Sequence, residues 1–284
     1  MPVAQEGAQR ASRHRSFRSG RFLAVAALAS IFAVGGLAAH PQVAAAAGKK
    51  VVIVVGPAGS NTSDYITNAK ALAKQARSYG ATVYEIYAPH ATWARVKSLS
   101  QGANVFIYLG HGNGYPSPYG AFNKYSKDGL GLDTTDGSYS HTYYGEYYVD
   151  RYLNFAPDAV VILNRLCYAS GNSEWGSANP TKATAIKRVD NFGAGFLRTG
   201  ARAVFAEGIT SASYILYGLF RTTRTMKQIF WSDPRHSGAY DFTFSSIRTP
   251  GKTAIMDPSS PGRYYRSVIG DLGMTAATWR SAGG

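Results

Sequence analysis

The stretch DAVVILNRLCYASG, residues 158–171, decides the fold class of this chain. Its apolar, β-branched run Val160–Leu163 is typical of a central parallel strand that is covered on both faces. Small, turn-forming residues follow, so Cys167 is expected at the carboxyl end of this strand. In open α/β sheets this is the end at which ligands bind.

A second apolar run ends in the same way. Residues 104–109, NVFIYL, lead into His111, which stands between two glycines. Upstream, strand patterns alternate with helical patterns, in the order 49–56, 62–77, 81–87 and 91–100. This β-α-β-α-β order predicts a parallel sheet with right-handed crossovers. We therefore expect an α/β fold, a three-layer sandwich with a mainly parallel central sheet.

The pattern continues beyond the cysteine and then breaks down. We expect a helix over residues 184–199, a strand over 202–207 and a long helix over 214–230. Clusters of Pro, Ser and Gly then predict an irregular C-terminal segment, residues 231–284. No linker composition appears after the N-terminal segment, so residues 48–284 are expected to form a single domain.

A long loop, residues 113–146, separates the two strands and is rich in Gly, Tyr, Pro and Asp. Loops of this length inside a compact domain usually have a function or lack order. Amphipathic tyrosine rings suit contact with peptide or sugar. Packing of the loop over the sheet edge is the alternative.

The N-terminus has the features of an export signal. Five arginines precede an apolar stretch, residues 22–39, and Ala45–Ala47 then offers an A-x-A cleavage site. These features predict a signal peptide over residues 1–47, cleaved near Ala47, and therefore a secreted, extracellular protein. An uncleaved membrane anchor is the alternative, which Gly35 disfavours because glycine weakens a long helix.

The chain is strongly basic, with a formal net charge of +14. It stays basic without residues 1–47, because this segment holds five arginines and one glutamate. A basic exported protein suits an anionic cell wall, a membrane surface or acidic substrates. A solvated basic surface without a specific partner is the alternative. We expect no nucleic acid partner, because the sequence shows no helix-turn-helix signature, zinc spacing or dense Lys/Arg run after residue 47.

The chain has a single cysteine, so Cys167 cannot form an internal disulfide. An idle exposed thiol is a liability in the oxidising environment of exported proteins, so Cys167 is either buried and inert or chemically used. An adjacent imidazole activates a thiol by taking its proton. If the two strands are neighbours, about 4.8 Å apart, His111 comes within reach of the sulfur. The backbone N–H groups of Cys167 and Gly112 are then candidates for binding an oxyanion.

Three segments together resemble the caspase-like fold of the clan CD cysteine peptidases, which include the CHAT, clostripain, gingipain, legumain and caspase families. They are YLGHG at 108–112, VVILNRLCYASG at 160–171 and FLRTGARAVFAEG at 196–208. The resemblance implies a catalytic dyad of His111 and Cys167, with Gly112 helping to bind the oxyanion. It also implies a thiol protease and, together with the predicted signal peptide, a secreted cysteine endopeptidase that hydrolyses a protein or peptide substrate.

The chain departs from the family pattern around the predicted site. Arg165 and Leu166 precede the cysteine, where CHAT-like members more often have small residues. Glu207, at the end of a later predicted strand, is a candidate for binding a basic substrate side chain, with a structural carboxylate as the alternative. These departures leave an alternative function open, a non-catalytic caspase-like module that binds cell-wall polymer or a protein partner.

Other enzyme classes and bound groups find no support in the sequence. Residues 56–59, GPAG, lack the Lys-Ser/Thr of a P-loop and the spacing of a dinucleotide-binding turn. No serine stands in G-x-S-x-G, the motif of the α/β-hydrolases. His90, His141 and His236 lack metal-ligand spacing, so we expect no metal ion and no cofactor.

Overall fold

The run Val160–Leu163 lies in the middle of a sheet, as its pattern predicts. The computed structural model describes residues 48–282. Within it, β6 (Ala159–Asn164) is buried along its whole length. Its parallel neighbours are β3 (Val105–Leu109) and β7 (Ala201–Glu207). Because both faces of β6 are covered, the strand is a continuous apolar run rather than an alternating one.

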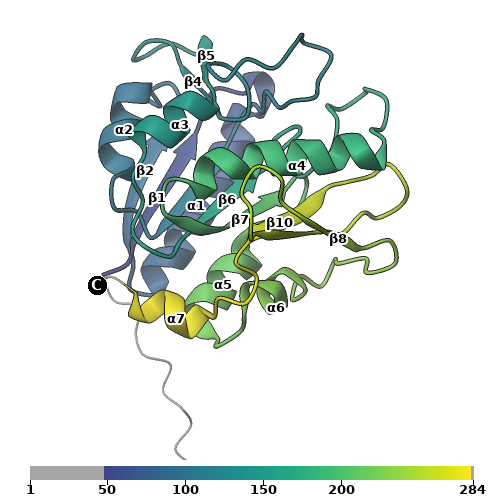
Figure 1. Ribbon diagram of the computed structural model, residues 1–284. Helices are drawn as coiled ribbons and strands as arrows, with labels where there is room; N and C mark the ends of the chain where they lie inside the picture. Colours follow the sequence, from purple (N-terminus) through teal and green to yellow (C-terminus); the bar gives the residue numbers. More distant parts are fainter. Residues whose placement is uncertain (1–47, 283–284) are drawn as a thin grey trace, which may run out of the picture. The chain divides into compact units, whose positions relative to one another are not determined.

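The eight-stranded sheet has the order β2-β1-β3-β6-β7-β10-β9-β8, and the first five strands of this order are parallel. One side of the sheet ends in β1 (Lys50–Val55) and β2 (Thr82–Tyr87). The other side ends in three antiparallel strands, β10 (Arg266–Gly270), β9 (Thr253–Met256) and β8 (Phe242–Ser245). Figure 1 shows this sheet and the helices around it.

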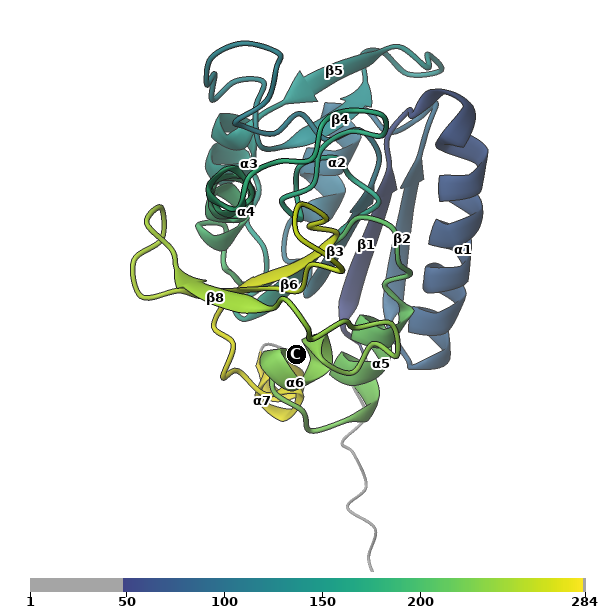
Figure 2. The same ribbon diagram turned by 90° about the vertical axis from the view of Figure 1, so that its right-hand side faces the viewer.

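Helices cover both faces of the sheet. One face carries α1 (Thr62–Ser78), α5 (Ser213–Arg221), α6 (Met226–Phe230) and α7 (Ala276–Ser281). The other face carries α2 (Trp93–Ser100), α3 (Glu146–Tyr152) and α4 (Lys182–Leu197). Alternate side chains of β1 enter the two hydrophobic cores. Ile53 packs into the core on the face that carries α1, and Val54 packs into the core on the face that carries α4. Figure 2 shows α1 on one side of β1 and β2 and α4 on the other. The predicted three-layer α/β sandwich with a mainly parallel sheet is confirmed.

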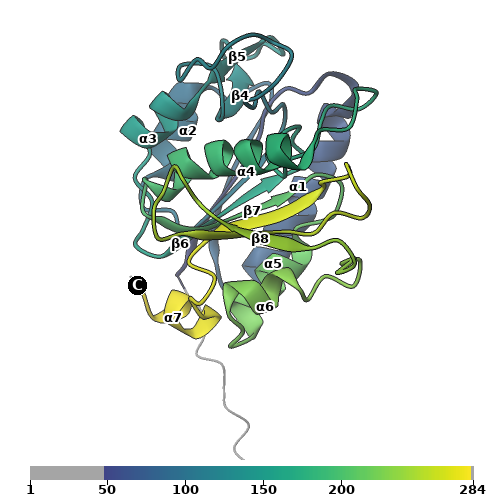
Figure 3. The same ribbon diagram turned by 45° about the vertical axis from the view of Figure 1, so that its right-hand side comes forward.

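The prediction of an irregular C-terminal segment is wrong. Within residues 231–282, the chain adds β8, β9 and β10 to the sheet and then forms α7. These strands have four or five residues each, and Pro- and Gly-containing turns join them. Antiparallel strands need only short turns, so no helical crossover marks them in the sequence. Figure 3 shows β8 at the edge of the sheet.

Two other segments also differ from their predictions. The long helix predicted over residues 214–230 is broken into α5 and α6, because Thr225 begins a new helix with a capping box. The loop 113–146 contains a short antiparallel pair, β4 (Leu130–Asp133) and β5 (His141–Tyr144). A brief 3-10 turn, η1 (Gly59–Asn61), precedes α1.

The predicted signal peptide, residues 1–47, lies outside the described residues, so secretion stays a prediction. Within residues 48–282, no helix combines the length and the hydropathy that a membrane crossing requires.

Candidate active site

The pairing of β3 with β6 brings the predicted dyad to one rim of the sheet. Leu109 lies opposite Asn164 in the register, so His111 and Cys167 follow the carboxyl ends of two adjacent parallel strands. The two strands are therefore neighbours, which confirms the condition on which the predicted dyad depends. Both residues line one cavity of about 520 Å³, together with Gly112, Asn113, Tyr119, Tyr143 and Glu174.

Strained backbone brackets the cysteine. Arg165 and Tyr168 have φ angles of 61° and 70°. This left-handed region costs a non-glycine residue about 1–3 kcal/mol and is found preferentially at functional sites. The Arg165 N–H donates to the Glu207 carbonyl on β7 at 2.7 Å, and the Ala169 N–H donates to the Cys167 carbonyl at 2.9 Å. These hydrogen bonds hold a sharp turn directly after β6, and Cys167 lies in this turn.

Gly112 lies against the backbone of Cys167. A Cβ atom at position 112 would lie 2.0 Å from the Cys167 carbonyl oxygen, so only glycine allows this approach. The residue predicted to help bind an oxyanion is therefore next to the cysteine. The role of its N–H group stays a prediction.

The Cys167 side chain is half-buried, and its thiol is protonated at neutral pH. Burial raises the pKa of the thiol to about 11, and the Glu174 carboxylate raises it further, whereas the Arg188 guanidinium and the Trp175 N–H act in the opposite direction. His111 is not among the groups that shift this pKa. Among the described residues, the site therefore holds a neutral thiol and not a thiolate–imidazolium pair.

His111 is also half-buried, and its ring contacts that of His141 on β5, with 4.8 Å between the ring centroids. Burial lowers the pKa of His111, His141 lowers it further, and Glu174 opposes both effects. The imidazole is therefore neutral at pH 7 and able to accept a proton. His141 has no role that its sequence position predicts, because only the β4–β5 pair brings it beside His111.

Glu174 joins the two loops that surround the cavity. The Tyr119 hydroxyl donates to the Glu174 carboxylate at 2.6 Å, which links the loop after β3 to the loop after β6. The carboxylate raises the pKa of both Cys167 and His111. No local sequence signal marks this contact, because the two partners are 55 residues apart.

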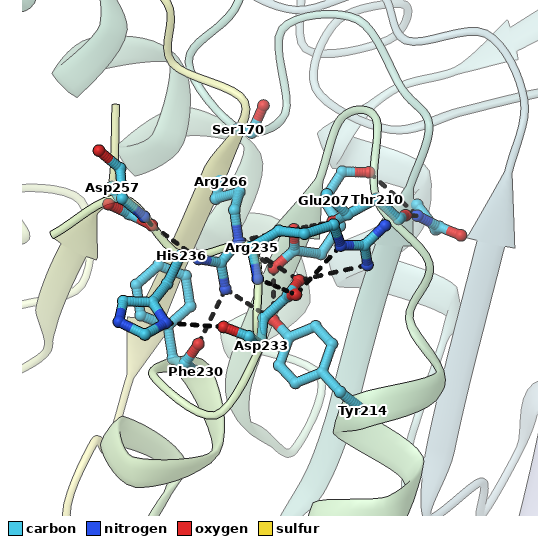
Figure 4. A network of polar contacts seen from close by, with 12 residues as sticks. Ser170, Glu207, Thr210, Tyr214, Phe230, Asp233, Arg235, His236, Asp257 and Arg266 are labelled. Atoms are coloured by element: carbon cyan, nitrogen blue, oxygen red, sulfur yellow. Dashed lines mark hydrogen bonds and ion pairs between the residues drawn. The ribbon is translucent and has the colours of Figure 1, made fainter. Parts of the chain in front are cut away.

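Glu207 is not in the cavity, so its predicted role in binding a basic side chain is wrong. Its carboxylate is fully buried and pairs with Arg266 on β10 at 3.1 Å. The hydroxyls of Thr210 and Tyr214 also donate to it. Figure 4 shows this network, in which Arg266 also pairs with Asp257 at 2.6 Å. Arg266 lies directly opposite Glu207 in the antiparallel register, so the carboxylate is structural.

Cys167 also lines a second cavity, of about 460 Å³, which His111 does not line. Its walls include Arg165 from the turn after β6, Tyr65 from the start of α1 and Ile209 from the loop after β7. The cysteine therefore lies between two cavities with different walls.

The first cavity is lined by a thiol, an imidazole and a carboxylate. The thiol and the imidazole match the nucleophile and the proton carrier that acyl transfer requires, and the oxyanion donors that it also requires stay a prediction. Within residues 48–282, no cluster of three or more His, Cys, Asp or Glu side chains is arranged to hold a metal ion.

No family model and no curated protein matches this sequence. Among solved structures, the chain is similar to a short-chain flavodoxin associated with a bacterial microcompartment, at 11% sequence identity. The match covers 55% of this chain and 77% of the flavodoxin chain, with a TM-score of 0.26. A similarity this weak carries no argument about function.

Proposed function

We propose that the protein is a secreted cysteine endopeptidase in which Cys167 is the nucleophile and His111 is the general base and acid. One observation carries the proposal. The two side chains come from distant parts of the sequence and line the same cavity, at the carboxyl ends of adjacent parallel strands. The caspase-like resemblance of the sequence, itself a prediction, points to the same pair.

The first step is attack on the scissile carbonyl group. Neutral His111 accepts the thiol proton while the Cys167 sulfur forms a bond to the carbonyl carbon. The raised pKa of the thiol fits a resting state in which the proton leaves only during the attack. Catalytic hydrogen bonds often tighten only once substrate is bound. The N–H groups of Gly112 and Cys167 donate to the developing oxyanion.

The remaining steps release the two products. The imidazolium gives its proton to the leaving amine as the C–N bond breaks, which leaves a thioester on Cys167. His111 then takes a proton from water, whose oxygen attacks the thioester carbonyl. The C–S bond breaks, the acid product leaves, and the thiolate recovers its proton from the imidazolium.

Hydrolysis of fluorescently labelled casein by the secreted protein tests this proposal. We expect the wild type to cleave casein and Cys167→Ala to lower the rate at least about 10³-fold, as loss of a nucleophile does in other peptidases. His90→Ala is the matched control, because His90 is exposed and pairs with Asp136 at 2.9 Å, away from the cavity. Unchanged hydrolysis in Cys167→Ala would overturn the proposal.

A second candidate function, a non-catalytic module that binds cell-wall polymer or a protein, has one observation in its favour. An aromatic cluster joins α2 to the segment before α3. Trp93 stacks on Tyr144, with 4.9 Å between the ring centroids and 12° between the ring planes. Further rings extend it, namely Tyr125, Tyr147, Tyr148 and Tyr152. Such amphipathic rings suit contact with sugar or peptide.

Sedimentation with insoluble cell-wall material at low salt tests this second candidate. A binding module predicts that the protein sediments with the wall, that Cys167→Ala does not change this, and that Tyr152→Ala weakens it. Tyr152 is 40% exposed, so its truncation leaves the core intact. Absence of binding at low salt would eliminate this candidate.

A further inference from the structure

The second cavity beside Cys167 is lined by one charged side chain, that of Arg165. The other lining residues are apolar or carry uncharged polar groups, such as Tyr65, Asn172 and Ile209. A cavity that adjoins the nucleophile and has a volume of about 460 Å³ has room for a substrate side chain. The charge of Arg165 therefore decides which side chain fits there.

Arg165 lacks the partners that a partly buried guanidinium normally has. Within residues 48–282, its side chain makes no ion pair or hydrogen bond, and its Nε atom is buried without an acceptor. The other described arginines whose side chains make no hydrogen bond or ion pair lie exposed on the surface, at Arg95, Arg151, Arg224 and Arg263. An unsatisfied buried donor is costly, so the structure holds Arg165 ready for an acceptor.

Neighbouring carboxylates do not supply that acceptor. Glu207 on β7 accepts from Arg266, Thr210 and Tyr214. Glu174 lines the other cavity and accepts from Tyr119. The φ angle of 61° at Arg165 is a second sign of function, because the chain keeps an unfavourable backbone conformation at this position.

The chemistry assigns the two cavities to the two sides of the scissile bond. His111 protonates the leaving amine, so the amine side of the substrate lies in the cavity that His111 lines. The residue that supplies the scissile carbonyl then extends to the other side of Cys167, into the cavity that Arg165 lines.

We infer that Arg165 selects substrates with an acidic side chain at the residue that supplies the scissile carbonyl. This inference rests on the proposed peptidase function and gives it a substrate class. A carboxylate forms charge-assisted, bidentate hydrogen bonds with a guanidinium. A lysine or arginine side chain would meet a like charge instead, which is the reverse of the basic preference that Glu207 suggested in the sequence.

Matched fluorogenic peptides that differ only at this residue test the inference. We expect the wild type to cleave the Asp or Glu peptide with a kcat/KM at least about tenfold above that of the Asn or Gln peptide, because loss of the charge leaves the guanidinium unpaired. Arg165→Gln should bring this ratio close to one, and Arg165→Glu should favour the Lys peptide. Arg95→Gln, an equal change of charge at an exposed arginine, should leave the ratio unchanged. Equal cleavage of Asp and Asn peptides by the wild type would overturn the inference and leave the peptidase proposal standing.

A second measurement does not need turnover. Iodoacetate and iodoacetamide have the same electrophilic carbon, but iodoacetate has a carboxylate where iodoacetamide has an uncharged amide. Mass spectrometry gives the rate at which each reagent modifies Cys167. We expect Arg165→Gln to lower the ratio of the iodoacetate rate to the iodoacetamide rate at least about threefold, since a nearby cation attracts the anionic reagent. If no peptide is cleaved, the peptidase proposal fails, and this ratio alone decides about Arg165. A ratio unchanged by Arg165→Gln would then overturn the carboxylate preference as well.

Discussion

The reactivity of Cys167 is set by its neighbours. An exposed cysteine has a pKa of about 8.5, whereas burial and the Glu174 carboxylate raise that of Cys167 to about 11. His111 has the opposite shift, because burial disfavours its charged form. Both shifts keep the thiol and the imidazole neutral, which protects the thiol from oxidation.

The pH dependence of alkylation tests this state of the thiol. In the absence of substrate, iodoacetamide should modify Cys167 at least about tenfold more slowly than a free thiol at pH 7.5, with a rate that still rises above pH 9. Glu174→Gln removes a negative charge that raises the thiol pKa, so it should shift the profile to lower pH. A profile with its midpoint below pH 8 in the wild type would contradict the resting state described above.

Gly112 gives a second prediction at the residue scale. In Gly112→Ala, the new methyl group meets the Cys167 carbonyl oxygen at 2.0 Å, so the turn that carries the thiol must shift. We expect a loss of about 1–3 kcal/mol in the free energy of unfolding, measured in urea, and at least a tenfold loss of casein hydrolysis. Gly273→Ala is the control, because its nearest neighbour would lie 3.7 Å from the new Cβ atom. Full activity in Gly112→Ala would contradict the close approach.

The loop between β3 and β4 contains a buried carboxyl group, that of Asp128. The Tyr115 N–H donates to one of its oxygens at 3.0 Å, and the other oxygen has no partner among the described residues. Burial raises the pKa of Asp128 to about 8, against the effect of the Tyr115 N–H. The folded protein therefore keeps this proton up to about pH 8, whereas the unfolded chain loses it near pH 4.

This difference makes stability depend on pH. The folded state binds one more proton than the unfolded state between about pH 4 and pH 8, so the contribution of Asp128 is present below pH 4 and declines as the pH rises. Asp128→Asn carries no proton to lose, and its unfolding midpoint should fall less than that of the wild type between pH 5 and pH 8. If the unfolding midpoints of the two proteins change equally with pH across this range, Asp128 is ionised in the folded protein, which would contradict this prediction.

At the scale of elements, β7 and β10 are joined by the buried pair of Glu207 and Arg266. Arg266→Met would leave Glu207 and Asp257 buried without their cation, so we expect a loss of about 3–5 kcal/mol in the free energy of unfolding. The surface pair of Arg77 and Glu85 provides the comparison, because the Arg77 side chain is 50% exposed. Arg77→Met should cost less than about 1 kcal/mol in the same urea titration. Equal effects of the two substitutions would contradict a structural role for the β7–β10 pair.

For the whole molecule, the sequence was informative where the signal is local. The parallel strands β1, β3, β6 and β7 are mostly buried apolar runs, so their period and length mark them in the chain. The strands β8, β9 and β10 have only four or five residues each and lack helical crossovers. β10 pairs with β7, β9 with β10 and β8 with β9, and no local pattern in the sequence records these pairings.

The same distinction explains the site. His111, Gly112 and Cys167 follow recognisable strands, so their place at one rim was predictable from the parallel order, whereas the pairing of the two strands had to be assumed. Glu207 also lies at the end of a predicted strand. Its carboxylate pairs with Arg266, which is 59 residues away in the sequence, so no local signal marks it as structural. Glu174 lines the cavity from a loop, and His141 contacts His111 from β5, so both positions depend on tertiary contacts. Secretion, the caspase-like family and the peptide substrate remain predictions.

The account depends most on the claim that Cys167 and His111 act together, and the rates of casein hydrolysis by both single variants and the double variant test it most directly. If the two residues form one catalytic unit, Cys167→Ala and His111→Ala each lower the rate at least about 10³-fold, and the double variant is no slower than either. Effects that multiply, or a His111→Ala variant as active as the wild type, would contradict it.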